Sequence, residues 1–319
     1  PPTSPSLFNI LNMKKIVTSK IGNINNKKKL THEIFVCKPD IVMHLAAQAL
    51  VVPSYQNPIE TFSTNIIGTA NLLESIRDIS SIKSCLIMTS DKAYENKEFN
   101  CAHIENNPMG GTDPYSASKG AAELVISSYR KPFFNEKNSP GIATIRAGNV
   151  IGGGDWANYR LIPDCIKSLI SKKNIILRNP RSIRPWQHVL EPLSGFLLIG
   201  SKLDKNSKKF SGPWNVGPSP KNSLLVESIV KKIIHQWGAG KIITEKNNLY
   251  EAKLLKLDSS KIFNLMKWKP TYSYDESIEK TVNWYLKYHK NKKTIQNFTI
   301  LQIEDYVKHA QKIKNGWIN

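Results

Sequence analysis

Continuously apolar segments alternate with amphipathic segments through the first 150 residues of the chain. The segments that we interpret as strands are 15–24, 40–48, 84–90 and 141–150. The segments that we interpret as helices, with apolar residues at three- and four-residue spacing, are 28–39, 58–78 and 114–134. Strands that are apolar throughout and separated by helices indicate a parallel sheet covered on both faces. The pattern therefore predicts a doubly wound, Rossmann-like α/β domain.

The pattern loosens after residue 150, where glycine- and proline-rich stretches separate shorter elements. This change indicates a second, smaller domain that binds the substrate. The predicted division is a larger domain of residues 1–150 with roughly 187–205, and a smaller C-terminal substrate-binding domain of residues 151–186 and 206–319.

The composition narrows the classes of partner and location. The chain has 319 residues, 40% of them hydrophobic, which is enough for a large core in about two domains. The net charge of +20 comes from basic residues spread along the whole chain, so neither nucleic acid nor a membrane surface is indicated as a partner. We find no signal peptide and no apolar run of the roughly 20 residues that a membrane span needs. We therefore expect a soluble, cytoplasmic protein.

The four cysteines and seven histidines are dispersed along the sequence. Cys37, Cys85, Cys101 and Cys165 form no C-x-x-C pair and have no histidine at zinc-ligand spacing. We expect reduced, mostly buried thiols and no metal site.

Two short motifs carry the predicted chemistry: TSDK, directly after an apolar strand, and YSASK further along the chain. Tyr115 and Lys119 are four residues apart on a predicted helix, so their side chains share one face. An ammonium beside the phenol favours the phenolate and lowers the tyrosine pKa from its ordinary value of about 10. A hydroxyl from Ser90 or Thr89 would help to hold a substrate hydroxyl while Tyr115 removes its proton.

The adjacent Asp91 and Lys92 form a candidate acid–base pair at the end of the same strand. Asp91 can act as a general acid where burial keeps its carboxyl protonated. Lys92 can act as a base only where desolvation or a nearby cation lowers its pKa from about 10.4 toward neutrality. The alternatives are that Lys92 orients a water molecule or stabilises an enolate, and the sequence leaves all three roles open.

A glycine-rich phosphate turn of the G-x-G-x-x-G type normally opens a dinucleotide-binding domain, and none is present near the start of this sequence. The GGGD stretch at 152–155 comes too late and lacks the strand-to-helix setting. We infer that the first βαβ unit is incomplete by roughly 40 residues. We expect this chain to bind a dinucleotide weakly, because the pyrophosphate would lack its helix N-terminus.

Six longer stretches carry a family resemblance: HLAAQALVVPSYQNPIETFSTNIIGT, TSDKAYEN, NPMGGTDPYSASKGAAELV, IRAGNVIGGGDWA, RLIPD and RNPRSIRPWQHVLEPLSG. Over nearly the whole chain, the sequence resembles the extended short-chain dehydrogenase/reductases and, within them, the CDP-glucose 4,6-dehydratases. The resemblance implies NAD as cofactor, CDP-glucose or a similar nucleotide sugar as substrate, and a homodimer or tetramer. The implied reaction is oxidation at carbon 4, loss of water across carbons 5 and 6, and hydride return to carbon 6, which supplies deoxysugar precursors such as those of O-antigen.

The same resemblance assigns roles to individual residues. The implied catalytic residues are Ser90, Asp91, Lys92, Tyr115 and Lys119. The residues implied to bind NAD in the first domain are Asn23, Ile24, Ala46, Ala47 and Gln48, together with Tyr115 and Lys119. The residues implied to bind the nucleotide sugar are Asn149, Arg160, Leu161, Ile162 and Arg184. Arg184 is the candidate for a bidentate contact with the diphosphate.

Two other interpretations stay open at the level of sequence. One is an NAD-dependent epimerase or reductase that acts on a nucleotide sugar. The Asp91–Lys92 pair argues against it, because an epimerase needs no acid–base pair for loss of water. The other is a catalytically impaired fragment, which the missing phosphate turn suggests.

Overall fold

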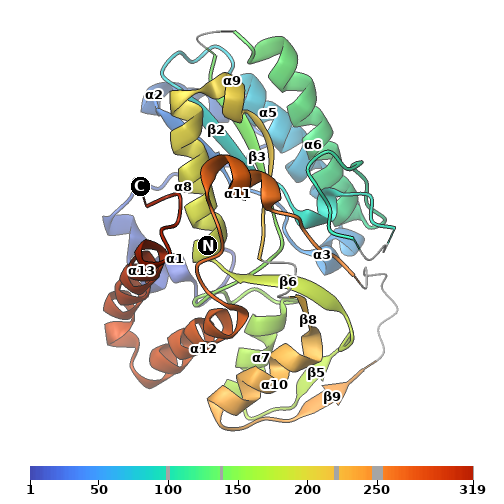
Figure 1. The fold of residues 1–319 in the computed structure, drawn as a ribbon, viewed down its shortest axis with the longest axis vertical. Coiled ribbons are helices and arrows are strands. Elements are labelled where there is room, and N and C mark those ends of the chain that lie inside the picture. Colours follow the sequence, from blue (N-terminus) through green and yellow to red (C-terminus); the bar gives the residue numbers. More distant parts are fainter. Residues whose placement is uncertain (98–100, 137–138, 219–222, 246–253, 319) are drawn as a thin grey trace.

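The computed structural model describes residues 1–97, 101–136, 139–218, 223–245 and 254–318. Its main sheet has four parallel strands in the order β1-β2-β3-β7 (Figure 1). Their bounds are β1 Ile41–His44, β2 Ser84–Met88, β3 Gly141–Ala147 and β7 Gly212–Val216. Parallel strands joined by helices confirm the predicted Rossmann-like α/β class.

Alternation along the strands directs neighbouring side chains into two separate cores. On β2, Cys85 and Ile87 belong to the core on one face, whereas Leu86 belongs to the core on the other face. The helices that cover the first face are α2 Lys27–Cys37, α5 Gly68–Ile76 and α6 Pro114–Phe133. The second face is covered by α8 Leu190–Lys205, which packs on β2 and β3. α8 thus packs against the sheet of the first domain.

A second lobe has its own small sheets and its own core. Its strands are β4 Asn149–Ile151, β5 Ile175–Leu177, β6 Ile183–His188, β8 Ser223–Leu225 and β9 Ile242–Thr244, arranged as β4-β6-β8 and β5-β9. Its helices are α7 Leu161–Ile170, α10 Val226–Trp237 and α12 Tyr274–Lys290. Aromatic packing fills this core, where the Trp156 and Tyr285 rings meet edge to face with centroids 5.3 Å apart.

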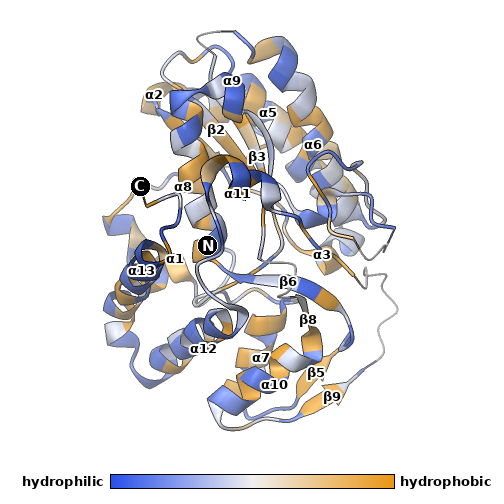
Figure 2. Cartoon of the chain, viewed as in Figure 1, coloured by the Kyte–Doolittle hydropathy of each residue, from blue (hydrophilic) through white to orange (hydrophobic). Residues whose placement is uncertain are grey.

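The other helices are shorter or lie at the chain ends. They are α1 Leu7–Ile10, α3 Val51–Gln56, α4 Pro58–Phe62, α9 Ser207–Phe210, α11 Ser260–Met266 and α13 Ile295–Lys312. Tighter or wider helical turns are η1 Met13–Lys15, the π-helical η2 Ser63–Ile67, η3 Asp91–Ala93 and η5 Lys292–Thr294. Figure 2 shows hydrophobic and hydrophilic residues alternating along α12 and α13, as expected for helices with one solvent face. Among the described residues, every helix is too short or too polar to span a bilayer.

The predicted strand at 15–24 is wrong. In the structure, η1 is followed by irregular chain, and Ile16, Val17 and Ile21 are exposed. Strand propensity depends on pairing with a neighbouring strand and on burial, and this segment has neither in the structure. The prediction of mostly buried thiols holds for Cys85 and Cys165, whereas Cys37 and Cys101 are exposed.

Two further differences concern the edges of the first domain. The sheet was predicted to be covered on both faces, but its edge strand β1 is partly open to solvent. Ile41 and Met43 on β1 are 44% and 42% exposed. The strand β7 was predicted to lie in the second domain, but it pairs with β3 in the main sheet. Residues 212–216 therefore extend the first domain, and the rest of the predicted division stays a prediction.

Candidate active site

The candidate active site forms where β2 ends and α6 begins. Asp113 Oδ1 accepts a hydrogen bond from Ser116 N at 3.0 Å and so caps the start of α6. Pro114 occupies the first helical position, where its missing N–H needs no partner. This defined start fixes Tyr115 and Lys119 on the helix face next to the turn η3, on which α6 packs.

The structure distinguishes the two candidate hydroxyls at the end of β2. Ser90 Oγ donates to Asp91 Oδ1 at 3.1 Å, and the Ser90 hydroxyl lies close enough to the Tyr115 phenol to oppose the rise of its pKa. Thr89 Oγ1 instead donates to Glu123 Oε1 at 2.6 Å. Ser90 is therefore the hydroxyl that lies with the predicted catalytic groups, whereas the Thr89 hydroxyl is directed to Glu123.

Asp91 is a buried carboxyl with 2% of its surface exposed. Among the residues that the structure describes, Asp91 Oδ2 has no hydrogen-bond partner. Burial raises the pKa of Asp91, and the positive charge of half-buried Lys92, the Ser90 hydroxyl and the charge of Arg184 oppose that rise. The environment therefore favours the protonated carboxyl, which is the form that a general acid needs.

Tyr115 and Lys119 are both buried, and burial controls their titration. Burial raises the pKa of Tyr115 to about 12, and the Ser90 hydroxyl and the charge of Arg160 only partly offset it. Burial lowers the pKa of Lys119 to about 8, and its Nζ donates to Met88 O at 3.3 Å. The predicted lowering of the Tyr115 pKa is therefore wrong for the chain by itself, because desolvation of the phenolate outweighs the nearby positive charge.

The close approach of β6 to Asp91 was not predicted. Arg184 is buried on β6, where its Nη1 donates to Ile183 O at 3.0 Å. A Cβ at Gly148 would lie 2.6 Å from Pro185 Cγ and 3.3 Å from Asp91 Oδ2, so this approach requires glycine. Arg184 thus lies close enough for its charge to act on Asp91, and its contact with a diphosphate stays a prediction.

His44, at the end of β1, is a buried residue that the sequence analysis missed. Its Nε2 lies 3.1 Å from Thr69 Oγ1. Burial and the charge of Lys119 lower the pKa of His44 to about 4, so the ring is neutral at physiological pH. The available signal was its position at a strand end, two residues before Ala46.

The residues predicted to bind NAD after β1 have different environments. Ala46 is exposed and Ala47 is half-buried. Gln48 Nε2 donates to Leu50 O and to Thr61 Oγ1, both at 3.0 Å. The Gln48 side chain therefore holds this loop, and a contact of that side chain with NAD would require these bonds to break.

The predicted adenine contacts, Asn23 and Ile24, precede α2, and Ile24 packs against α5. Asn23 Oδ1 accepts a hydrogen bond from Asn25 N at 2.9 Å, within a local turn. Ile24 O accepts from Asn71 Nδ2 at 3.2 Å, and its side chain packs so closely that a Cβ at Gly68 would clash with it. Their role with adenine stays a prediction.

The predicted sugar-nucleotide residues divide between the site and the core of the second lobe. The charge of Arg160 acts on the Tyr115 phenol, which places this arginine near the catalytic groups. Ile162 is buried in the core and Leu161 packs against it. Their predicted pocket contacts stay a prediction. Asn149 is half-buried at the start of β4.

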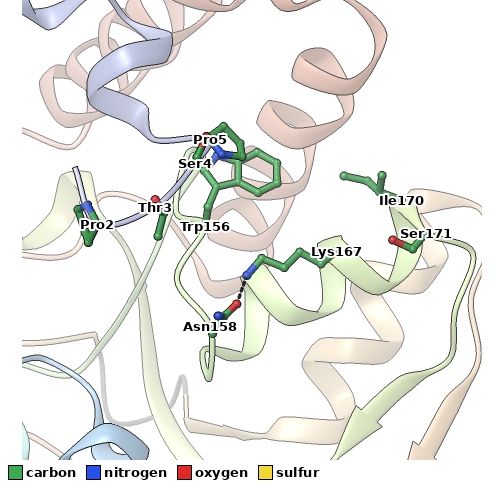
Figure 3. Close-up of a pocket in the computed structure, with 9 residues that line it drawn as sticks. All are labelled: Pro2, Thr3, Ser4, Pro5, Trp156, Asn158, Lys167, Ile170 and Ser171. Atoms are coloured by element: carbon green, nitrogen blue, oxygen red, sulfur yellow. Dashed lines mark hydrogen bonds between the residues drawn. The ribbon is translucent and has the colours of Figure 1, made fainter.

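A cavity of about 510 Å³ lies apart from the predicted residues (Figure 3). It is lined by Pro2, Thr3, Ser4, Pro5, Trp156, Asn158, Lys167, Ile170 and Ser171. Lys167 Nζ donates to Asn158 Oδ1 at 2.6 Å across its floor. Within the described ranges, no cluster of three or more His, Cys, Asp or Glu side chains could hold a metal ion.

Proteins with similar sequences align with this chain over most of its length. Residues 9–281 match the family described as GDP-mannose 4,6 dehydratase. The chain is 48% identical over 290 residues to the CDP-glucose 4,6-dehydratase of Salmonella typhimurium, covering 89% of this chain and 81% of that protein. The chain belongs to the GDP-mannose 4,6 dehydratase family. Membership of this family supports dehydration of a nucleotide sugar as the activity.

More distant relatives of the family member described here include epimerases. The CDP-paratose 2-epimerase of Salmonella typhi is 26% identical over 294 residues, with 82% of each chain covered. A solved UDP-glucuronic acid 4-epimerase of Bacillus cereus, in complex with UDP-glucuronic acid and NAD, has a TM-score of 0.76 at 19% identity, covering 89% of this chain and 88% of its own. DesIV, a dTDP-glucose 4,6-dehydratase of Streptomyces venezuelae, has a TM-score of 0.73 at 20% identity, covering 85% and 79%. These structures share the fold, and the epimerase alternative has less support than the dehydratase.

Proposed function

We propose that this chain is a CDP-glucose 4,6-dehydratase that converts CDP-glucose to CDP-4-keto-6-deoxyglucose. The observation that carries the proposal is 48% identity to the Salmonella typhimurium protein of that description, against 26% to the CDP-paratose 2-epimerase. The site supports it, because a phenol, an ammonium, a hydroxyl and a buried carboxyl of raised pKa lie together at the end of β2 and the start of α6. A cytoplasmic location and a place in O-antigen or other deoxysugar precursor synthesis belong to the same proposal.

The residues at this site fit the nicotinamide end of NAD, the cofactor that the fold family implies. Lys119 Nζ makes one hydrogen bond among the described residues, to Met88 O, so two of its three N–H donors remain for ribose hydroxyls. When bound, NAD+ would accept hydride from carbon 4, would return it to carbon 6 in its reduced form, and in its oxidised form would add positive charge to the site of the Tyr115 phenol. Experiments should provide NAD+ in excess, because the sequence contains no glycine-rich phosphate turn near its start.

In the first half of the proposed reaction, Tyr115 removes the proton of the carbon 4 hydroxyl. Ser90, which interacts with both Tyr115 and Asp91, holds that hydroxyl in place. The Lys119 ammonium stabilises the phenolate that receives the proton. The pKa of about 12 for Tyr115 in the chain alone means that this transfer needs further positive charge at neutral pH.

In the second half, the carbon 4 ketone acidifies the hydrogen on carbon 5. Lys92, or a water molecule that it orients, removes this proton as the double bond between carbons 5 and 6 forms, and the same group returns a proton to carbon 5 when hydride is delivered to carbon 6. Asp91 gives its proton to the carbon 6 hydroxyl, so that the carbon–oxygen bond breaks and water leaves. The burial that raises the Asp91 pKa favours the protonated carboxyl before its proton is transferred to the carbon 6 hydroxyl.

The direct test is turnover by the purified chain with excess NAD+ and CDP-glucose, followed by the alkaline absorbance of the 4-keto sugar. We expect product from CDP-glucose and much less from GDP-mannose or dTDP-glucose. Interconversion of UDP-glucose and UDP-galactose without any 4-keto product would support the epimerase instead.

The Lys92→Met variant is expected to separate oxidation from loss of water. Methionine keeps the unbranched side chain but has no group to take the carbon 5 proton or to stabilise an enolate. Carbon 4 oxidation, measured as reduced cofactor in a single turnover, should proceed, while product formation should fall about 10²–10⁴-fold. Lys97→Met is the matched control, because Lys97 is exposed and pairs with Glu95. Product formation by Lys92→Met at the rate of the unchanged chain would remove Lys92 from the mechanism.

We extend the proposal to a homodimer that pairs through α6 and the preceding α4–α5 segment. α6 packs beside α4 and η2. Each of these three elements carries an exposed apolar side chain. Ile59, Ile67 and Leu124 are 78%, 54% and 63% exposed in the single chain. Apolar side chains exposed on adjacent helices are typical of a protein–protein interface.

The Leu124→Lys variant is expected to be a monomer in light scattering behind a sizing column. Two lysines, one from each subunit, would face each other across the interface, and their repulsion and desolvation oppose pairing. Leu197→Lys on α8 is the matched control, because Leu197 is 58% exposed and lies outside the proposed interface. A Leu124→Lys dimer as stable as that of the control would exclude this face.

A further inference from the structure

Ser90, Asp91 and Lys92 lie on a short segment whose two ends bind the same buried ion pair. The segment begins at Thr89 and ends at Tyr94. At its start, Thr89 Oγ1 donates to Glu123 Oε1 at 2.6 Å. At its end, Tyr94 OH accepts a hydrogen bond from Arg146 Nη1 at 2.8 Å. Glu123 and Arg146 are therefore joined to both sides of the turn that carries the proposed acid and base.

The ion pair itself is bidentate and almost fully enclosed. Arg146 Nε donates to Glu123 Oε1 at 2.9 Å and Arg146 Nη2 donates to Oε2 at 2.8 Å, with 4% of each side chain exposed. Alternation along β3 places Thr144 beside the pair as well, where its Oγ1 donates to Glu123 Oε2 at 3.0 Å. A buried ion pair adds little net stability over an apolar pair of the same size, so a role in fixing geometry deserves a test.

The same pair is attached to the helix that carries the other catalytic groups. Tyr115, Lys119 and Glu123 follow one another at four-residue spacing along α6, so they share one face of that helix. α6 also approaches the turn closely, since a Cβ at Gly120 would lie 3.0 Å from Ala93 O. Glu123 thus lies on the same helix as the phenol and the ammonium, and the hydrogen bonds of the pair reach Thr89 and Tyr94, which flank the hydroxyl, acid and base.

We propose that Glu123 and Arg146 are positioning residues that hold the turn with Asp91 and Lys92 at a fixed place relative to Tyr115 and Lys119. The inference deepens the proposed function and rests on it for its kinetic consequence. Dehydration requires that Asp91 and Tyr115 contact the same hexose ring at the same time. Displacement of a catalytic group by about 1 Å can lower the rate by a factor of 10².

Thr89→Val tests this role without breaking the ion pair, since valine keeps the shape of threonine and removes only the hydroxyl held by Glu123. We expect kcat to fall about 10- to 100-fold while KM for CDP-glucose changes less than about threefold. Thr89→Ser restores the hydroxyl and should recover most of the lost rate. Thr144→Val is the matched control, because it removes the same kind of bond to the same carboxylate from β3 and not from the turn.

Amide hydrogen exchange of the unchanged and variant chains gives a readout that is independent of turnover. Loss of the Thr89 bond should speed exchange in the peptide that spans residues 89–94 by about tenfold, and Thr144→Val should leave that peptide unchanged. Equal kcat values and equal exchange in Thr89→Val and Thr144→Val would overturn the inference. If the unchanged chain forms no product, the proposed function fails, and exchange at residues 89–94 still decides for or against the positioning role.

Discussion

The Tyr115→Phe variant is expected to form 4-keto product about 10²–10⁴-fold more slowly than the unchanged chain. The phenol oxygen is the only atom that the substitution removes, and it is the proposed acceptor of the carbon 4 hydroxyl proton. The ring is buried at the start of α6, and phenylalanine preserves its packing. Because oxidation comes first, the single-turnover signal of reduced cofactor should be lost together with the product.

The matched control for this variant is Tyr129→Phe. Tyr129 lies on the same helix, and its hydroxyl interacts with Glu74 away from the site. We expect Tyr129→Phe to keep the rate of the unchanged chain within about threefold. A loss of less than about tenfold in Tyr115→Phe, measured beside this control, would show that another group takes the proton.

Asp91→Asn should abolish loss of water while leaving carbon 4 oxidation in place. Asparagine has nearly the same shape as aspartic acid, but its amide cannot release a proton to the departing hydroxyl. We expect product formation to fall about 10²–10⁴-fold and reduced cofactor to accumulate in a single turnover. The measurements are the alkaline absorbance of the product and the absorbance of the reduced cofactor in the same reaction.

The same substitution should stabilise the folded chain at neutral pH. Burial raises the Asp91 pKa above its ordinary value of 3.8, so the folded state holds a proton that the unfolded state releases. Stability therefore falls as pH rises from about 3.8 to the folded pKa, and the loss is constant above that. Asparagine is neutral in the folded and the unfolded state, so Asp91→Asn avoids this loss of stability. The melting temperature of Asp91→Asn should exceed that of the unchanged chain at pH 7, with a gain that shrinks toward about pH 4.

Asp78→Asn is the control for both effects, because the Asp78 side chain is 86% exposed. It should change neither the rate nor the pH dependence of the melting temperature. Two results would contradict the role of Asp91: product at the normal rate, or a melting temperature at pH 7 that drops as for an ordinary loss of a carboxylate contact.

Local patterns allowed prediction of the helices and of most strands in the first domain. The spacing of apolar residues identified α2, the α4–α5 segment and α6, because helical periodicity is a property of nearby residues. The predicted strand at 15–24 failed because strand formation needs a partner that sequence spacing does not reveal. The single predicted strand at 141–150 is two strands, since the chain changes sheet at Gly148, where only glycine fits against Pro185.

The candidate site divides in the same way. Sequence spacing placed Tyr115 and Lys119 on one helix face and Asp91 at a strand end, and family resemblance supplied their roles. Which hydroxyl faces the site could not be predicted, because Ser90 and Thr89 alternate across the end of one strand and the buried Glu123 decides between them.

By itself, the sequence determined the α/β class, the family and the positions of the proposed catalytic side chains along the chain, since these depend on local periodicity and on motif identity. Only the tertiary structure decided the rise of the pKa values of Tyr115 and Asp91 and the joining of both proposed catalytic segments to Glu123 and Arg146. The physical reason is that desolvation and buried hydrogen bonds depend on residues far apart in sequence, and these residues meet only when the sheet and its helices pack.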